Sequence, residues 1–320
     1  MKKAKLYKLG NTAVTIIVVL LCLYYLKSIY NSKLNSVDWS LTVDTISRNY
    51  GLFIIVVLLV PLNWGMEIVK WKWILKDVQN LSWLQSVKSV LCGVALSIVT
   101  PNGIGDYGGR MLGIESKNRS QALFRNGFLS FSQLLVTFVF GLLGLLVVKD
   151  QINFPLPSLI IDLISWLLIG AGFWVYFQSK FRFKFVKSFL LKFNQHVSFE
   201  LSLLDRLKIL LLSLIRYIVF CSQFYLLLLC FKSDLGVYET FSSIAFVFLC
   251  SAIIPTGWFS SVVVRGGVSF FVFQSVLGAG EIGVVVSSLL WLINLLVPAL
   301  IGFYLAKTPM LFPTINQQKI

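Results

Sequence analysis

The sequence has too few charged residues for a water-soluble protein. Only 13% of its 320 residues are charged, whereas 57% are hydrophobic. Soluble domains are about one-quarter charged. Because so little polar surface cannot coat a globule in water, the composition predicts a polytopic membrane protein.

Residue types that build catalytic and metal centres are also scarce. The chain has one histidine, His196, and its five cysteines lie in apolar runs without C-x-x-C spacing. Such cysteines behave as small hydrophobic residues rather than as disulfides or metal ligands. The acidic signatures D-x-D and H-x-x-x-x-D, which would support a membrane-embedded transferase, do not occur. We therefore expect no enzyme activity, no metal ion and no cofactor.

Long apolar runs dominate what is present. A helix needs about 20 apolar residues to cross the bilayer core. Six runs predict spanning helices, at about residues 13–26, 51–75, 128–148, 159–177, 209–231 and 282–306. These runs and their loops use nearly the whole chain, so we predict an all-α fold with a single integral membrane domain over residues 1–320.

Two further apolar stretches are too short to span. Val87–Val99 and Phe241–Ile254 would each form a helix of roughly 20 Å, against a hydrocarbon core of about 30 Å. Each ends at a proline that is followed by glycines and an arginine. We predict two re-entrant, broken-helix hairpins beside the six full helices. Eight complete helices remain the alternative, if each stretch continues into the apolar residues after it.

Basic residues concentrate in alternate loops. Eight Lys and Arg residues lie between positions 70 and 125 and seven between 180 and 208, within a net charge of +15. The positive-inside rule explains this pattern without binding to nucleic acid. It predicts that both termini lie on the cytoplasmic side of the cell (inner) membrane. An odd number of spans then separates the two hairpins. Residues of about 51–148 and 209–306 would form an inverted repeat, the usual plan of secondary transporters.

Glycines and prolines mark where the hairpins should bend. The backbone positions are Pro101, Gly103, Gly105, Pro255, Gly257 and Gly266. Gly103-x-Gly105-x-x-Gly108 also matches the dinucleotide fingerprint, which requires a preceding strand. Here an apolar helical segment precedes it, so we expect no nucleotide.

Five charged residues are candidates for binding a substrate. They are Glu67, Lys70, Asp106, Arg110 and Arg265. Irregular backbone at membrane depth is tolerated where it lines a polar cavity or is buried in protein, and an arginine can hold a phosphate bidentately. The alternatives are a solvated turn for Asp106 and Arg110, and a side chain reaching the interface for Arg265.

Three other assignments follow from position along the predicted helices. Glu67 and Lys70 are three residues apart and can pair with each other, as a structural contact or as part of a cavity. Arg216 lies about two turns inside its span, which leaves interface and functional roles equally open. Tryptophans near span ends, Trp71 among them, are interpreted as a membrane-interface belt.

Two motifs resemble a known family. Asn63, Glu67 and Lys70-Trp71, followed by Pro101-Asn102-Gly103-Ile104-Gly105-Asp106 and Arg110, are similar to the transmembrane flippase domain of lysylphosphatidylglycerol synthases and its stand-alone relatives. Pro255-x-Gly257 and Val264-Arg265-Gly266-Gly267 resemble a later stretch of that family, so the resemblance covers about residues 10–306.

The resemblance implies a lipid flippase that moves an aminoacylated or otherwise modified phospholipid between leaflets. Its partners would be the phospholipid headgroup and a separate lipid-modifying enzyme, because the chain ends shortly after its last predicted span. The family often has Glu at the position of Asp106 and near Val268-Ser269. Because this chain differs there, the resemblance does not imply that it takes the same cationic headgroup as the family. The alternative is a secondary transporter of a small solute or ion with the same inverted repeat.

Overall fold

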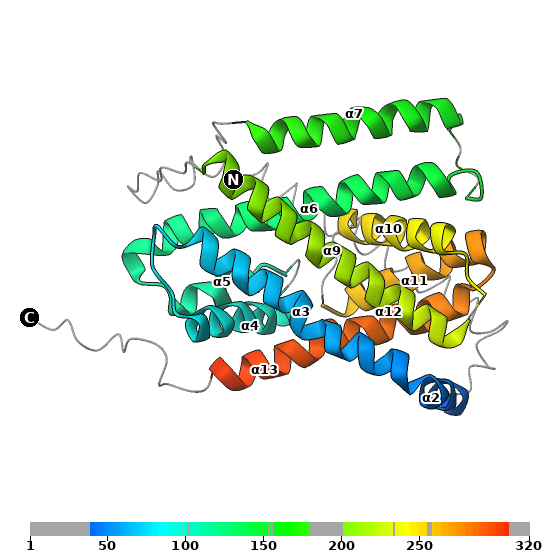
Figure 1. Cartoon of the computed structure of the whole chain (residues 1–320), viewed down its shortest axis with the longest axis horizontal. Coiled ribbons are helices and arrows are strands. Elements are labelled where there is room, and N and C mark those ends of the chain that lie inside the picture. Colours follow the sequence, from blue (N-terminus) through cyan, green and yellow to red (C-terminus); the bar gives the residue numbers. More distant parts are fainter. Residues whose placement is uncertain are drawn as a thin grey trace, which may run out of the picture. The chain divides into compact units, whose positions relative to one another are not determined.

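The computed structural model describes residues 39–100, 103–152, 154, 156–178, 201–232, 234–254 and 258–306. All regular secondary structure in these ranges is helical (Figure 1). The longer helices are α2 (Trp39–Arg48), α3 (Tyr50–Ile74), α4 (Trp83–Val99), α5 (Gly105–Arg110), α6 (Arg119–Val148), α7 (Ser158–Phe177), α9 (Leu203–Phe231), α10 (Val237–Ile253), α11 (Trp258–Leu277), α12 (Gly280–Trp291) and α13 (Val297–Ala306). Short turns are η3 (Met111–Gly113), η4 (Ser116–Asn118) and the π-helical η5 (Leu292–Leu296).

Five helices are long and apolar enough to cross a membrane. They are Tyr50–Ile74, Ser116–Val148, Ser158–Phe177, Leu203–Phe231 and Gly280–Ala306. Five of the six predicted spans are thereby confirmed as long apolar helices. The sixth, at about 13–26, lies outside the described residues, as do Pro101, Pro255, Gly257, His196 and both termini. The identity of the membrane and the orientation of the chain stay predictions.

The two short apolar stretches do form short helices. α4 and α10 have 17 residues each, fewer than the roughly 20 that a span needs. Thr100 (ψ 143°) and Ile254 (ψ 115°), which come directly after them, are extended. Both residues precede a proline, whose ring disfavours the helical conformation for the residue before it. Proline therefore ends both helices.

The segments that come after these two helices differ from each other. α4 is succeeded by α5, which has six residues, and then by η3. α10 is succeeded by α11, which has 20 residues. The second segment is thus a short helix followed by a long one, whereas the first is a short helix followed by a six-residue helix and a turn. The number of complete crossings and the inverted repeat stay predictions.

Contacts divide the chain into two compact units. Unit 1 comprises Met1–Pro61, Thr137–Ile169 and Tyr217–Asn294, and unit 2 comprises Leu62–Val136, Gly170–Arg216 and Leu295–Ile320. Each of the five long apolar helices contributes residues to both units. The predicted repeats at about 51–148 and 209–306 are each divided between the units, so the units do not correspond to the repeats.

Glycines set the helix packing inside each unit. In unit 1, a Cβ atom on Gly144 of α6 would lie 2.4 Å from the carbonyl oxygen of Ser242 on α10. In unit 2, a Cβ atom on Gly302 of α13 would lie 2.0 Å from the carbonyl oxygen of Leu91 on α4. Real side chains do not approach backbone so closely, hence only glycine permits these helix pairs to touch. Small residues serve this purpose generally in membrane helix packing.

Candidate functional site

The candidate site lies in unit 2 and begins with one polar face of α3. Asn63, Glu67 and Lys70 are spaced by four and three residues, so they project from the same side of this helix. Their relative exposures are 2%, 5% and 0%. Ionised side chains buried so completely require partners, because removing an unpaired charge from water is very costly.

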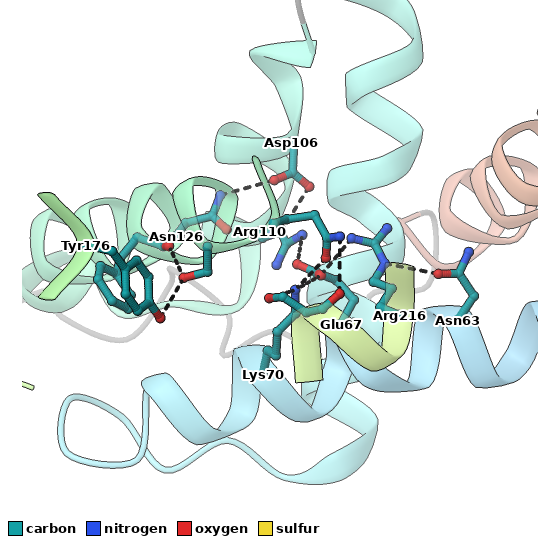
Figure 2. Close-up of polar contacts among 12 residues, drawn as sticks. Asn63, Glu67, Lys70, Asp106, Arg110, Asn126, Tyr176 and Arg216 are labelled. Atoms are coloured by element: carbon teal, nitrogen blue, oxygen red, sulfur yellow. Dashed lines mark hydrogen bonds and ion pairs between the residues drawn. The ribbon is translucent and has the colours of Figure 1, made fainter. Parts of the chain in front are cut away.

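Glu67 is the shared partner of three cations. Its Oε2 atom lies 2.8 Å from Lys70 Nζ and 3.0 Å from Arg216 Nη1, and its Oε1 atom lies 2.9 Å from Arg110 Nη2. Figure 2 shows these three cations around the carboxylate. The cations come from α3, α5 and α9, so a single carboxylate joins three helices.

Arg110 is also held by a second carboxylate. Its Nε atom donates to Asp106 Oδ1 at 2.9 Å, one turn earlier on α5. Asn126 of α6 donates through Nδ2 to Asp106 Oδ2 at 3.1 Å (Figure 2). The guanidinium carbon lies 5.3 Å from the ring centre of Trp71, which gives a cation–π contact. The Arg110 side chain is thus fixed from three sides.

The other two cations have neutral partners as well. Lys70 Nζ donates to Gln133 Oε1 and to Ser213 Oγ, each at 3.2 Å. Arg216 Nε donates to Asn63 Oδ1 at 3.1 Å (Figure 2). We call the five charged residues Glu67, Lys70, Asp106, Arg110 and Arg216 the charge cluster.

The glycine motif positions α5 against α4. Gly103 has φ +65°, a left-handed conformation that favours glycine. Cβ atoms on Gly105 and Gly109 would lie 2.1 and 2.4 Å from carbonyl oxygens of α4. One on Gly108 would meet no atom within 4 Å. The glycines therefore serve close helix packing, and no strand precedes them in the described part of unit 2, which removes the context that a dinucleotide site needs.

Gly93 of α4 leaves room for the acidic side chain. A Cβ atom there would lie 2.5 Å from Asp106 Oδ1 and 2.9 Å from Arg110 Cγ. The backbone of α5 is tied to the end of α4 by Gly105, whose N–H donates to Thr100 Oγ1 at 2.7 Å. Helix packing and the Asp106–Arg110 pair consequently depend on the same small residues.

The charge cluster carries an excess positive charge. It contains three cations and two carboxylates. Arg110 Nη1 in the cluster, and Oδ1 of Asn126, which binds Asp106, are buried without a hydrogen-bond partner among the described residues. Buried polar atoms are normally satisfied, and one that is not calls for an explanation. A net positive charge with a spare guanidinium donor is suited to an anionic group.

The structure brings together four of the five predicted substrate-binding residues. Glu67, Lys70, Asp106 and Arg110 all belong to the charge cluster. Arg265 does not, because it lies on α11 in unit 1. Across the described ranges, its side chain has no ion pair or hydrogen bond.

Gly266, predicted as a bending point, lies inside α11, so the hairpin role is wrong there. A Cβ atom at this position would lie 3.7 Å from Val284, an ordinary packing contact. Trp71 was predicted to lie at the membrane interface, and this is also wrong. The residue is fully buried, and its indole N–H donates to Ser89 Oγ at 2.9 Å.

Some of the site residues were not assigned from the sequence. Arg216, for which two roles were open, binds Glu67. Asn126, Gln133 and Ser213 were not identified at all. Asn126 and Gln133 are polar residues seven positions apart in α6, a spacing that places them on one face. That signal was available in the sequence.

The two carboxylates of the site bind basic side chains. In the described part of the chain, no group of three or more His, Cys, Asp or Glu side chains could hold one. Glu67 and Asp106 are joined through Arg110 rather than converging on a common point.

Comparison with known proteins adds no assignment. No family model matches the chain, and neither a curated protein nor a solved structure matches it. Function is therefore inferred from the charge cluster and from the motifs in the sequence.

Proposed function

We propose that the protein is a lipid translocase, which moves a phospholipid between the leaflets of the membrane. The observation that carries the proposal is the charge cluster, with its excess positive charge and the unpartnered Nη1 atom of Arg110. Ionisable residues within membrane helices are costly and mark substrate or ion pathways. A phosphodiester matches this site in charge and in hydrogen-bond acceptors.

Arg110 is the residue that receives the phosphate in this proposal. Guanidinium groups bind phosphate oxygens through paired N–H donors. A phosphate oxygen that accepts from Nη1 satisfies the buried donor and offsets the excess charge. Asp106, beside it, offers a carboxylate to an amine in the same headgroup, so an aminoacylated or otherwise modified lipid suits the site.

Arg265 is the second binding site for the lipid headgroup in this proposal, after Arg110. It lies in an apolar stretch of α11, where a charge is expensive unless it has a function. It is partly buried, and its side chain makes no ion pair or hydrogen bond with any residue whose placement is described. The Arg265 guanidinium is therefore available to bind a phosphate that has left Arg110.

The test is lipid movement in vesicles that contain only the purified protein. Fluorescent phospholipids of anionic, zwitterionic and aminoacylated types are quenched from outside, and the fraction protected in the inner leaflet is followed over time. We expect the wild type to expose inner-leaflet lipid faster than empty vesicles. Arg110→Lys keeps the charge but loses the paired donors, and Arg265→Ala removes the second headgroup-binding site. Both substitutions should slow the exposure of inner-leaflet lipid at least about tenfold, the effect of a lost charged contact.

Lys117→Ala is the matched control. Lys117 is an exposed cation on η4, paired with exposed Glu115, and its removal should leave the rate unchanged. Thermal unfolding and gel filtration verify that each variant is folded. If wild type and empty vesicles behave alike for all three lipid types, unassisted lipid translocation is wrong. Uptake of a small anion by the same vesicles would then favour a solute transporter.

A further inference from the structure

An apolar groove in unit 1 has no role in the proposal above. It has a volume of about 700 Å³ and is lined by residues of α6, α9 and α10. Its walls include Phe140, Leu143, Tyr217, Cys221, Phe241 and Ala245. The volume lies within the range of sites that hold small organic ligands, roughly 300–1,000 Å³.

Packing in unit 1 explains why the groove exists. Gly144 allows α6 to touch the backbone of α10 on one side. Aromatic rings keep the helices apart elsewhere, as where Phe140 and Tyr217 have ring centres 5.3 Å apart. Close approach at one point and bulky side chains at another leave a hollow between the three helices.

The groove opens onto an apolar surface. Ile218, Val237 and Tyr238, which line it, are also exposed large hydrophobic residues. α6 and α9 belong to the helices that are long and apolar enough to cross a membrane. When these helices cross a membrane, their outer surface faces lipid chains, so hydrocarbon is what can enter the groove.

One polar group in the groove wall, the Tyr217 hydroxyl, favours a ligand that also carries a hydrogen-bond acceptor. Tyr217 is 5% exposed, and its hydroxyl has no hydrogen-bond partner of ordinary strength in the described residues. The Cys221 thiol, one turn away, is its polar neighbour, and thiols are weak hydrogen-bonding groups. A buried hydroxyl without a good partner is costly, whereas the carbonyl of a fatty-acid ester would accept from it.

We infer that this groove binds one acyl chain of a membrane glycerolipid, with the ester carbonyl of that chain accepting a hydrogen bond from the Tyr217 hydroxyl. The inference does not rest on lipid translocation, because all residues that line the groove belong to unit 1 and a stationary lipid satisfies them. Bound lipid and transported lipid are therefore separate measurements.

The first test counts bound lipid by native mass spectrometry. The protein is reconstituted with phosphatidylglycerol that carries ester-linked chains, extracted in mild detergent and weighed intact. We expect one lipid to be retained per chain. Leu143→Trp fills the groove and should abolish retention of the lipid. Leu167→Trp, on α7 at a position that is 72% exposed, should leave retention unchanged. Equal retention by both variants overturns the inference.

The second test isolates the hydrogen bond. Tyr217→Phe keeps the ring and removes the hydroxyl, which should weaken retention of the ester lipid about fivefold, the effect of one ordinary hydrogen bond. An ether-linked analogue lacks the carbonyl, so wild type and Tyr217→Phe should retain it equally. If wild type retains ester and ether lipids equally, the ester contact is wrong.

The third test needs no substitution and is independent of variant folding. A phosphatidylglycerol with a photoreactive diazirine in its acyl chain is crosslinked to the wild-type protein in vesicles. Labelled peptides should cover residues 140–147 and 217–221 in preference to the exposed face of α7. Equal labelling of both regions would show ordinary surface contact and contradict a specific groove.

Discussion

The α4–α5 segment of unit 2 and the α10–α11 segment of unit 1 begin alike and continue differently. In both, a 17-residue helix ends at an extended residue before a proline. The arginine after the first is bound by two carboxylates, whereas Arg265 after the second has no comparable partner among the described residues. A similar local motif therefore does not determine its electrostatics. The carboxylate that distinguishes the first segment, Glu67, is supplied by α3.

The strongest way to abolish this difference is to remove the shared carboxylate. Glu67→Gln leaves the buried cations Lys70 and Arg110 and the partly buried Arg216 with only Asp106 to compensate them. We expect the free energy of unfolding to fall by at least about 3 kcal/mol, as for other broken buried ion pairs. Chemical unfolding in detergent measures this. Glu115→Gln, which breaks an exposed pair, is the control, and an equal effect of both substitutions would contradict the central role of Glu67.

The glycine contacts of the first segment give the next largest effect. A Cβ atom on Gly105 would lie 2.1 Å from the Leu96 carbonyl oxygen, whereas one on Gly108 has open space. Gly105→Ala should lower the free energy of unfolding by about 2 kcal/mol through overpacking. Gly108→Ala should leave it unchanged or raise it slightly, because alanine favours helix. A similar cost at both positions would argue against the packing role of the motif.

The smallest effect on stability is expected at the arginine of the second segment. Arg265→Ala removes a charge that has no ion pair in the described residues, so the free energy of unfolding should stay within about 0.5 kcal/mol of the wild type or rise. Thermal unfolding beside the lipid-movement assay measures both properties of one sample. A loss of stability as large as that of Glu67→Gln would mean that Arg265 has a structural partner.

Local features of the site were predictable, and contacts between helices were not. Asp106 and Arg110 are four residues apart and Glu67 and Lys70 three, so helical spacing alone indicates both pairs. The Glu67–Arg110 contact joins residues far apart in the sequence, and no local pattern encodes it. The long apolar helices were predictable from hydropathy, because chain length and composition determine whether a segment can span.

Trp71 shows why some of the prediction failed. Tryptophan near the end of a span is typical of the membrane interface, and the sequence does not reveal which helix covers it. Here α4 does so, since Ser89 of that helix accepts the indole hydrogen bond. Gly266 failed for a related reason, because glycine pairs occur within membrane helices as well as at their ends.

The backbone contact between Gly302 and Leu91 has a consequence for biosynthesis. α4 leaves the ribosome long before α13, its packing partner in unit 2. Until the last described helix is made, one surface of α4 lacks the neighbour that its backbone is shaped to touch. Contacts this distant in sequence form late and slowly. α4 therefore reaches its final packing only near the end of translation, and a chain interrupted before α13 would leave that surface of α4 without its partner.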